Sequence, residues 1–259
     1  LQPEKLKDES FLIQLAALKA DLQIVVAFRM LPEIVWNMPR LGTFNLHGSL
    51  LPQYRGAAPI NRAVMNGESE TGVSTFFLQQ EIDTGKIIFR EKTSIGENES
   101  AGEVHDKLMM IGAGLVLKTV QAIENDNYTQ TDQSEFIKPN QEIKNAPKIF
   151  KEDCQINWEL SLDKIHNHIR GLSPYPAAFT SFISPNGQSH PVKFFISKKE
   201  NSSTSVPVKS ILTDSKTYLK IAVTGGYITI EELQLAGKKK MGIQEFLRGF
   251  SINNDWKVG

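Results

Sequence analysis

The first half of the chain alternates between strand-like and helix-like patterns of apolar residues. Residues 22–28 form a continuous β-branched run, which is typical of a strand covered on both faces. Ser100 and Glu103 form a capping box that begins a long helix. The other elements that the pattern predicts are strands at 43–47, 72–78 and 86–92 and helices at 12–19, 33–37 and 59–66. Because strands alternate with helices, we expect an α/β domain with a mostly parallel sheet.

The second half has a different pattern, and a polar segment separates it from the first. Residues 127–148 are rich in polar residues and proline, which indicates a linker between a domain at 1–126 and another at 149–259. The elements predicted beyond it are helices at 162–170 and 243–249 and strands at 178–183, 191–197, 208–212, 217–223 and 227–235. These short strands predict a small antiparallel β domain that can close into a barrel.

Composition and charge narrow the class of protein. The formal net charge is +0, so no global field attracts nucleic acid, and any basic binding surface must be local. No apolar stretch is long enough to span a bilayer, and we expect no membrane partner. Cys154 is the only cysteine, which excludes an internal disulfide and fits a reducing compartment, so we expect a cytoplasmic protein. His166 and His168 would face different sides of a helix, and we expect no metal site.

Polar residues follow two of the predicted strands. Asn45 and His47 lie two positions apart at the end of a strand, so both side chains point to one face. Alone, such a pair is more often structural than catalytic. Asp83 follows a second strand, and a parallel arrangement would place it at the same end of the sheet, although Asp-Thr-Gly is also a common turn sequence. Together the three form a set suited to acyl transfer, with an amide to polarise a carbonyl, an imidazole as acid or base, and a carboxylate to orient it.

These residues carry a resemblance to a known family. The motif Asn45-x-His47-x-Ser49-x-Leu51-Pro52, with Asp83-Thr84-Gly85 downstream, resembles the formyltransferases that use 10-formyltetrahydrofolate. The order and the spacing both match that family.

The segment that follows the motif and three segments of the second half narrow the resemblance. Arg55-Gly56-Ala57-Ala58-Pro59 is similar to methionyl-tRNA formyltransferases, to a sugar-nucleotide formyltransferase and to the hydrolase domain of formyltetrahydrofolate dehydrogenase, whereas purine-pathway enzymes generally lack it. The segments at 156–158, 169–176 and 233–241 resemble the second domain of methionyl-tRNA formyltransferases. The resemblance therefore covers essentially the whole chain.

The family's architecture sets the expectation for the fold. The resemblance implies an α/β, Rossmann-like catalytic domain, a linker, and an antiparallel, OB-like barrel domain that helps to hold initiator tRNA. Family members begin with a strand–helix–strand unit that carries a basic loop. The given sequence begins with Leu1, after that unit, so we expect the catalytic domain to be N-terminally incomplete here.

The resemblance also assigns roles to individual residues. It makes Asn45, His47 and Asp83 the catalytic residues. The residues expected to contact the co-substrate 10-formyltetrahydrofolate are Phe28, Arg29, Met30, Leu31, Ser49, Leu50, Leu51, Pro52 and Ile82. The residues expected to contact tRNA are Arg55, Lys238, Lys239, Lys240 and Arg248. From run length alone, the three lysines are more often a solvated loop than a binding site.

We therefore expect an enzyme that transfers a formyl group from 10-formyltetrahydrofolate to the methionine of initiator methionyl-tRNA. Its expected partners are that tRNA and the folate, and we expect a monomer. Two alternatives stay open from the residues. One keeps the folate site but sends the formyl group to a sugar-nucleotide amine or to water, and the other is a non-catalytic protein that binds tRNA or folate.

Overall fold

The structure is a computed structural model that describes residues 1–27, 30–203 and 205–259. The chain divides into two compact units, and each is interrupted in sequence. The first unit comprises Leu1–Pro59, Glu70–Ser94 and His105–Pro147. The second comprises Ile60–Ser69, Ile95–Val104 and Lys148–Gly259. The boundaries predicted from the sequence, at 126 and 148, stay a prediction.

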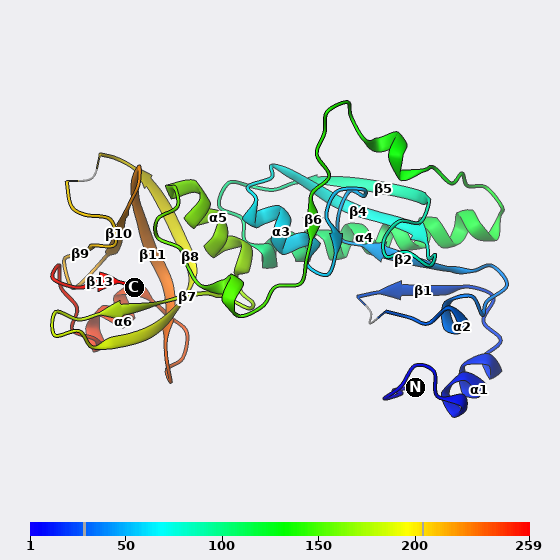
Figure 1. Cartoon of the computed structure of the whole chain (residues 1–259), viewed down its shortest axis with the longest axis horizontal. Helices are drawn as coiled ribbons and strands as arrows, with labels where there is room; N and C mark the ends of the chain where they lie inside the picture. Colours follow the sequence, from blue (N-terminus) through cyan, green and yellow to red (C-terminus); the bar gives the residue numbers. More distant parts are fainter. Residues whose placement is uncertain (28–29, 204) are drawn as a thin grey trace. The chain divides into compact units, whose positions relative to one another are not determined.

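The first unit contains a four-stranded sheet with the order β1 (Gln23–Val26), β2 (Thr43–His47), β4 (Glu70–Phe77) and β5 (Ile87–Ser94) (Figure 1). Only β1 and β2 are parallel, whereas β4 is antiparallel to both β2 and β5. The expectation of a mostly parallel sheet was therefore wrong, and the sheet is mixed. The connection at 78–86 is too short for a crossover helix, so β4 and β5 must run in opposite directions.

Helix α4 (Ala101–Glu124) packs against this sheet and begins at the predicted capping box. The Ser100 backbone N–H donates to the Glu103 carboxylate at 2.8 Å, and the Glu103 N–H donates to the Ser100 hydroxyl at 3.3 Å. Thr119 on the helix lies 3.0 Å from Thr75 on β4, hydroxyl to hydroxyl. Leu46 on β2 also faces the helix, because a Cβ at Gly112 would lie 2.8 Å from its side chain. Since neighbouring residues of a strand point to opposite faces, the helix covers the face of the sheet opposite to Asn45.

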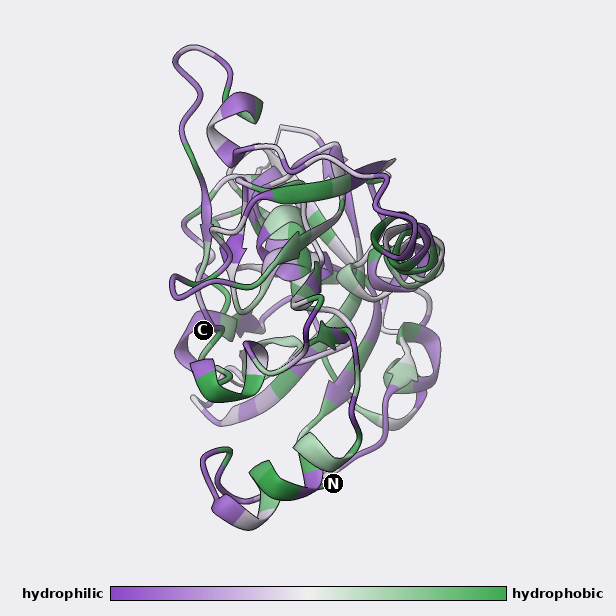
Figure 2. Cartoon of the chain, turned by 90° about the vertical axis from the view of Figure 1, so that its right-hand side faces the viewer, coloured by the Kyte–Doolittle hydropathy of each residue, from purple (hydrophilic) through white to green (hydrophobic). Residues whose placement is uncertain are grey.

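The remaining helices of the first unit are short. Helix α1 (Glu9–Ala17) is capped by Asp8, which accepts from the Ser10 N–H at 2.9 Å. It has no buried residue, and its ribbon carries both hydrophobic and hydrophilic residues (Figure 2). The other is α2 (Glu33–Trp36), whereas α3 (Pro59–Met65) belongs to the second unit apart from Pro59. Within the described ranges, no helix is long and apolar enough to cross a membrane.

The second unit contains an antiparallel sheet that is nearly closed. Its strand order is β13 (Lys257–Val258), β7 (Ala178–Ile183), β8 (Ser189–Asn201), β11 (Gly226–Leu235), β10 (Leu219–Val223) and β9 (Ile211–Thr213), with β12 (Met241–Gly242) beside β11. A bridge between Ser210 and Lys257 brings the two ends of this order together, as in a barrel. Helices α5 (Leu162–Leu172) and α6 (Ile243–Gly249) pack on a core that includes Phe182, Phe194 and Phe246.

A buried histidine on α5 makes the second unit sensitive to acid. His166 is 1% exposed, and its Nδ1 lies 3.2 Å from the Ser197 hydroxyl. Burial lowers the pKa of His166 to about 4, and the nearby Arg170 and Lys199 also lower it, while Glu97 opposes them.

We expect the free energy of unfolding to fall as the pH drops from 6.5 towards 4, because the unfolded chain then binds a proton that the folded chain excludes. The pKa difference corresponds to about 3 kcal/mol, all of it present above pH 6.5. Urea unfolding at several pH values should show a flatter profile for His166→Gln than for the wild type. Parallel profiles for the two proteins would contradict this assignment.

Candidate active site

Strand β2 presents Asn45 and His47 on one face of the first sheet. Both side chains are buried, at 3% and 7% exposure. Phe44 and Leu46 alternate with them and point to the opposite face, where Leu46 approaches α4. The two polar residues are therefore placed by the strand itself, as the sequence predicts.

His47 is held by a backbone carbonyl on one side and faces a carboxylate on the other. Its Nε2 lies 2.9 Å from the Tyr54 carbonyl oxygen, and because a carbonyl only accepts, Nε2 carries the proton. Its Nδ1 lies 3.8 Å from Asp83 Oδ2, which is too long for a hydrogen bond but close enough for strong electrostatic interaction. Nδ1 is therefore the ring nitrogen that faces the Asp83 carboxylate.

Asp83 reaches His47 by a route that the sequence does not indicate. Strand β4 ends beside the beginning of β2, with Phe77 opposite Phe44, so the reasoning from parallel strands was wrong. The connection after β4 folds back, and the Gly56 N–H donates to Asp83 Oδ2 at 3.0 Å. Asp83 has a left-handed backbone, with φ +54°, which is uncommon for a residue other than glycine.

Gln133, which the sequence did not single out, holds the Asp83 loop through hydrogen bonds to its backbone carbonyls. It is 5% exposed and lies in a 3₁₀ turn at Gln133–Phe136. Its Nε2 donates to the carbonyls of Asp83 and Gly85, at 2.8 and 2.9 Å. Its Oε1 accepts from Arg55 Nε at 3.0 Å and from Arg55 Nη2 at 2.6 Å. One amide therefore ties the Asp83 loop to the Arg55 guanidinium.

The chain beyond Gln133 returns to pair with the loop that follows β2. Strand β6 (Asn145–Ala146) runs parallel to β3 (Arg55–Gly56), and the Tyr54 N–H donates to the Lys144 carbonyl at 2.6 Å. Gly56 has φ +124°, and a Cβ there would lie 2.5 Å from the Ala146 carbonyl oxygen. The requirement for glycine at position 56 is the one local signal of this close approach.

The Asn45 side chain is buried with its oxygen unpaired. Its Oδ1 has no hydrogen bond within the described residues. Buried polar side chains in folded proteins are nearly always paired, and an unpaired one at a strand end indicates a ligand-binding position. The unpaired oxygen can accept from a ligand, and the Nδ2–H of the same amide can donate to a carbonyl oxygen that carries developing negative charge.

The residues predicted to contact folate differ in exposure. Met30 and Ile82 are 73% and 58% exposed, so their apolar side chains are available to a ligand. Ser49 is buried and donates to the Gln53 carbonyl at 2.6 Å, which shapes the loop. The others are buried, as Leu51 and Pro52 are, or partly buried, as Leu31 and Leu50 are. Phe28 and Arg29 lie outside the described residues.

The residues predicted to contact tRNA fall in both units. Arg55 is half-buried, because Gln133 holds its guanidinium. Lys239 pairs with Glu245 at 3.3 Å, and Lys240 pairs with Glu232 at 2.8 Å. Lys238 and Arg248 are exposed. Exposed ion pairs contribute little stability, so these lysines can exchange a carboxylate for a phosphate at low cost.

No group of three or more His, Cys, Asp and Glu side chains forms a potential metal site in the part of the chain that the structure describes.

Comparison with known proteins identifies the class. The family model described as Formyl transferase matches residues 1–120, and the model of the Formyl transferase C-terminal domain matches residues 148–251. Among solved structures, HypX from Aquifex aeolicus in complex with tetrahydrofolic acid is 20% identical, with a TM-score of 0.64, and the match covers 93% of this chain and 41% of that one. The sugar 3N-formyl transferase WlaRD is 23% identical, with a TM-score of 0.60, over 83% of this chain and 73% of that one. The chain thus has the formyl transferase fold, a Rossmann-like domain followed by an OB-like barrel, as expected.

Relatives with much higher sequence identity show which family of formyltransferases the chain belongs to. The methionyl-tRNA formyltransferase of Bacteroides thetaiotaomicron is 54% identical over 258 residues, and that of Parabacteroides distasonis is 55% identical over 259 residues. Each match covers 100% of this chain and 80% of the relative. The chain belongs to the methionyl-tRNA formyltransferase family.

Proposed function

We propose that this protein transfers the formyl group of 10-formyltetrahydrofolate to the amino group of methionine on initiator methionyl-tRNA. The observation that carries the proposal is a buried Asn45 side chain with an unpaired Oδ1, on the same strand as His47, which faces Asp83. Identity above 50% to methionyl-tRNA formyltransferases supports the choice of acceptor. A solved neighbour that binds tetrahydrofolic acid supports the choice of donor.

The chemistry requires a free amine and a stabilised oxyanion. The amine nitrogen forms a bond to the formyl carbon, the bond from that carbon to the folate nitrogen breaks, and the proton lost by the amine ends on the folate nitrogen. In this proposal Asn45 donates its amide N–H to the formyl oxygen as negative charge develops there. His47 receives the proton at Nδ1, the nitrogen that faces Asp83 at 3.8 Å. Asp83 stabilises that charge until the proton passes to the departing folate nitrogen. In an alternative route, Asp83 itself accepts the amine proton through water in place of His47.

The folate is proposed to lie against the loops that follow β1 and β2. Met30 and Ile82 offer exposed apolar surface to its rings, and backbone groups of the Ser49–Pro52 segment can form hydrogen bonds with the pterin edge. Contacts from Phe28 and Arg29 belong to the proposal on the resemblance alone.

An acceptor assay tests the proposed function. The protein should transfer the formyl group from 10-formyltetrahydrofolate to charged initiator tRNA much faster than to a sugar-nucleotide amine or to water. Faster transfer to the sugar amine, or release of formate without tRNA, would assign the site to one of the alternatives. Binding of tRNA without any transfer would make the protein non-catalytic.

The lysines at 238–240 provide a separate test of tRNA binding. If they pair with phosphates, the triple alanine variant should weaken tRNA binding for any sequence and lower the salt slope by about 0.9 for each phosphate that is no longer neutralised. Lys92→Ala, which removes an exposed lysine of the first unit, serves as a control. Filter binding over a series of salt concentrations measures both quantities. A salt slope unchanged in the triple variant would remove these lysines from the proposed interface.

A further inference from the structure

A hollow of about 850 Å³ on the second unit has no role in the function proposed above. Its walls include three aromatic residues, Phe150, Tyr175 and Phe179, and two lysines, Lys151 and Lys193. The volume lies in the range of about 300–1,000 Å³ that is typical of pockets for small ligands. All of these residues belong to the stretch Lys148–Gly259, so the hollow is complete within one unit.

Two of the aromatic rings are exposed although their backbones are anchored. Tyr175 is 82% exposed and Phe150 is 58% exposed. The Phe150 N–H donates to the Asp153 carboxylate at 3.0 Å, and the Ala177 N–H donates to the Leu172 carbonyl at 2.9 Å, closing the turn that carries Tyr175. An exposed ring on a fixed backbone loses little entropy when a flat ligand stacks on it.

Among the residues that the structure describes, the lysines around the hollow have no carboxylate partner. Lys148 places its Nζ 5.5 Å from the centre of the Phe150 ring, and Lys193 Nζ donates to the Pro176 carbonyl at 3.5 Å. Neither of them, nor Lys151, forms an ion pair within the described residues. In contrast, Lys239 and Lys240 are both paired with glutamates.

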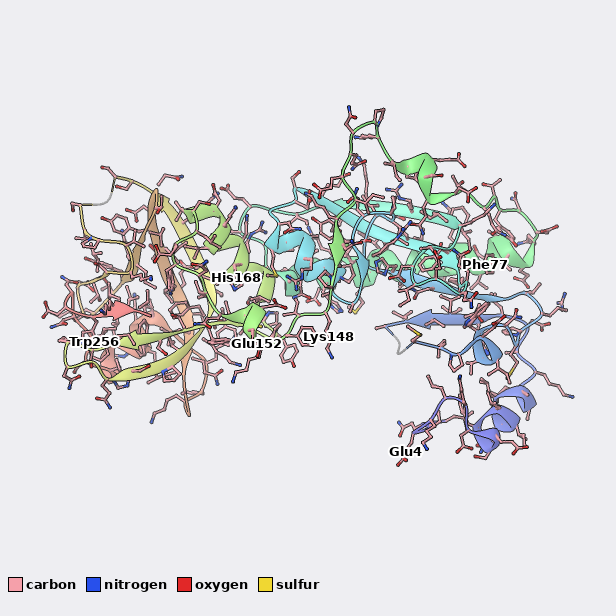
Figure 3. The ribbon with its side chains drawn as sticks, viewed as in Figure 1. Glu4, Phe77, Lys148, Glu152, His168 and Trp256 are labelled. Atoms are coloured by element: carbon pink, nitrogen blue, oxygen red, sulfur yellow. The ribbon has the colours of Figure 1, made fainter. Side chains whose placement is uncertain are left out.

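Two acidic residues, Glu152 and Asp153, directly follow Lys151 in the sequence. Figure 3 labels Lys148 and Glu152, which lie on the segment that leads into the second unit. The carboxylate of Asp153 is occupied by Arg62, at 3.2 Å, and by the Phe150 N–H. Glu152 is not part of the walls of the hollow.

We propose that this hollow binds an unpaired nucleotide of the RNA substrate. The base stacks on Tyr175 or Phe150, and Lys151 and Lys193 pair with the flanking phosphates. Exposed aromatic rings beside unpaired cations are the combination that recognises single-stranded nucleic acid, since every base has a π face and every linkage has a negative charge. The proposal rests on the proposed function, which supplies the RNA.

Ring variants of the full chain test the stacking. Of Tyr175→Ala and Phe150→Ala, at least the variant that removes the stacking ring should weaken the binding of initiator tRNA roughly tenfold, without a change in salt dependence. Tyr175→Phe and Phe150→Tyr keep a ring and should bind within about twofold of the wild type. Tyr218→Ala is the matched control, because Tyr218 is exposed in the same unit with Lys220 5.5 Å from its ring centre, yet does not line the hollow.

Two further arms define the ligand. Lys151→Gln and Lys193→Gln should each lower the salt slope by about one, which the ring variants should not do. A blunt RNA duplex offers no unpaired base, so Tyr175→Ala should bind it as the wild type does. Fluorescence anisotropy measures all of these affinities, and melting curves confirm that each variant is folded.

The outcomes separate this proposal from the proposed function. A wild-type chain that neither binds nor formylates initiator tRNA overturns the proposed function. A wild-type chain that binds and formylates it, with folded ring variants that bind as tightly as Tyr218→Ala, overturns the proposal for the hollow. A tenfold weaker binding of the blunt duplex by Tyr175→Ala would also overturn the proposal for the hollow, because stacking on an unpaired base cannot explain that result.

Discussion

Asn45→Ala is expected to lower the rate of formyl transfer by roughly 10²–10³-fold, because the variant loses the donor proposed to stabilise the oxyanion. That loss corresponds to about 3–4 kcal/mol in the barrier. The stability of the fold should change little, since the Asn45 Oδ1 has no hydrogen bond to lose. Folate binding should also persist, because the amide is proposed to act mainly in the transition state.

The same prediction applies to Asp83, the carboxylate of the proposed catalytic set. Asp83→Ala should also bind folate and lose turnover. The Asp83→Asn side chain can still accept from the Gly56 N–H, so the variant should retain the fold. It carries no charge towards His47, so its rate of formyl transfer should nevertheless be low. Single-turnover transfer and fluorescence titration with folate measure the two quantities separately.

Asn127→Ala, which truncates an exposed asparagine of the first unit, is the control for these variants. Transfer at close to the wild-type rate in Asn45→Ala or Asp83→Ala would exclude the residue concerned from the proposed mechanism. A loss of folate binding equal to the loss of turnover would instead make the residue part of the binding site.

The local features of the site could be predicted from the sequence. Period-two alternation was enough to place Asn45 and His47 on one face of β2, and the strand has the predicted bounds. Turn and capping residues likewise placed the beginning of α4 at Ala101 and the bounds of β7 at Ala178–Ile183. In each case the information lies within a few residues of the element.

The long-range features could not be predicted, and the reason is physical. The direction of β4 depends on which strand it pairs with, and the hydrophobic pattern is the same for both directions. Asp83 meets His47 through a loop that folds back and is held by one hydrogen bond from Gly56 and two from Gln133. One polar contact between distant residues leaves no periodic signal in either segment.

Gln133→Leu is expected to reduce both stability and turnover. The substitution keeps the volume but removes two donors and the acceptor, so the carbonyls of Asp83 and Gly85 lose a buried partner and Arg55 loses its anchor. Each buried polar group left unpaired costs about 1–3 kcal/mol. Because the Asp83 backbone is in the left-handed region, a loop released in this way should relax and move the carboxylate away from His47.

Gln133→Glu separates the contact of Gln133 with Arg55 from its contacts with the carbonyls of the Asp83 loop. A glutamate still accepts from Arg55, with a stronger charge-assisted bond, but it cannot donate to the two carbonyls and places a negative charge beside them. We therefore expect Gln133→Glu to keep KM for tRNA near the wild-type value, if Arg55 contacts the tRNA, while kcat falls as in Gln133→Leu. The control is Gln121→Leu on the exposed side of α4, which should change neither urea unfolding nor kcat. Wild-type kcat in Gln133→Leu would show that the Asp83 loop keeps its conformation without this amide, and the positioning role would then belong to the Gly56 N–H alone.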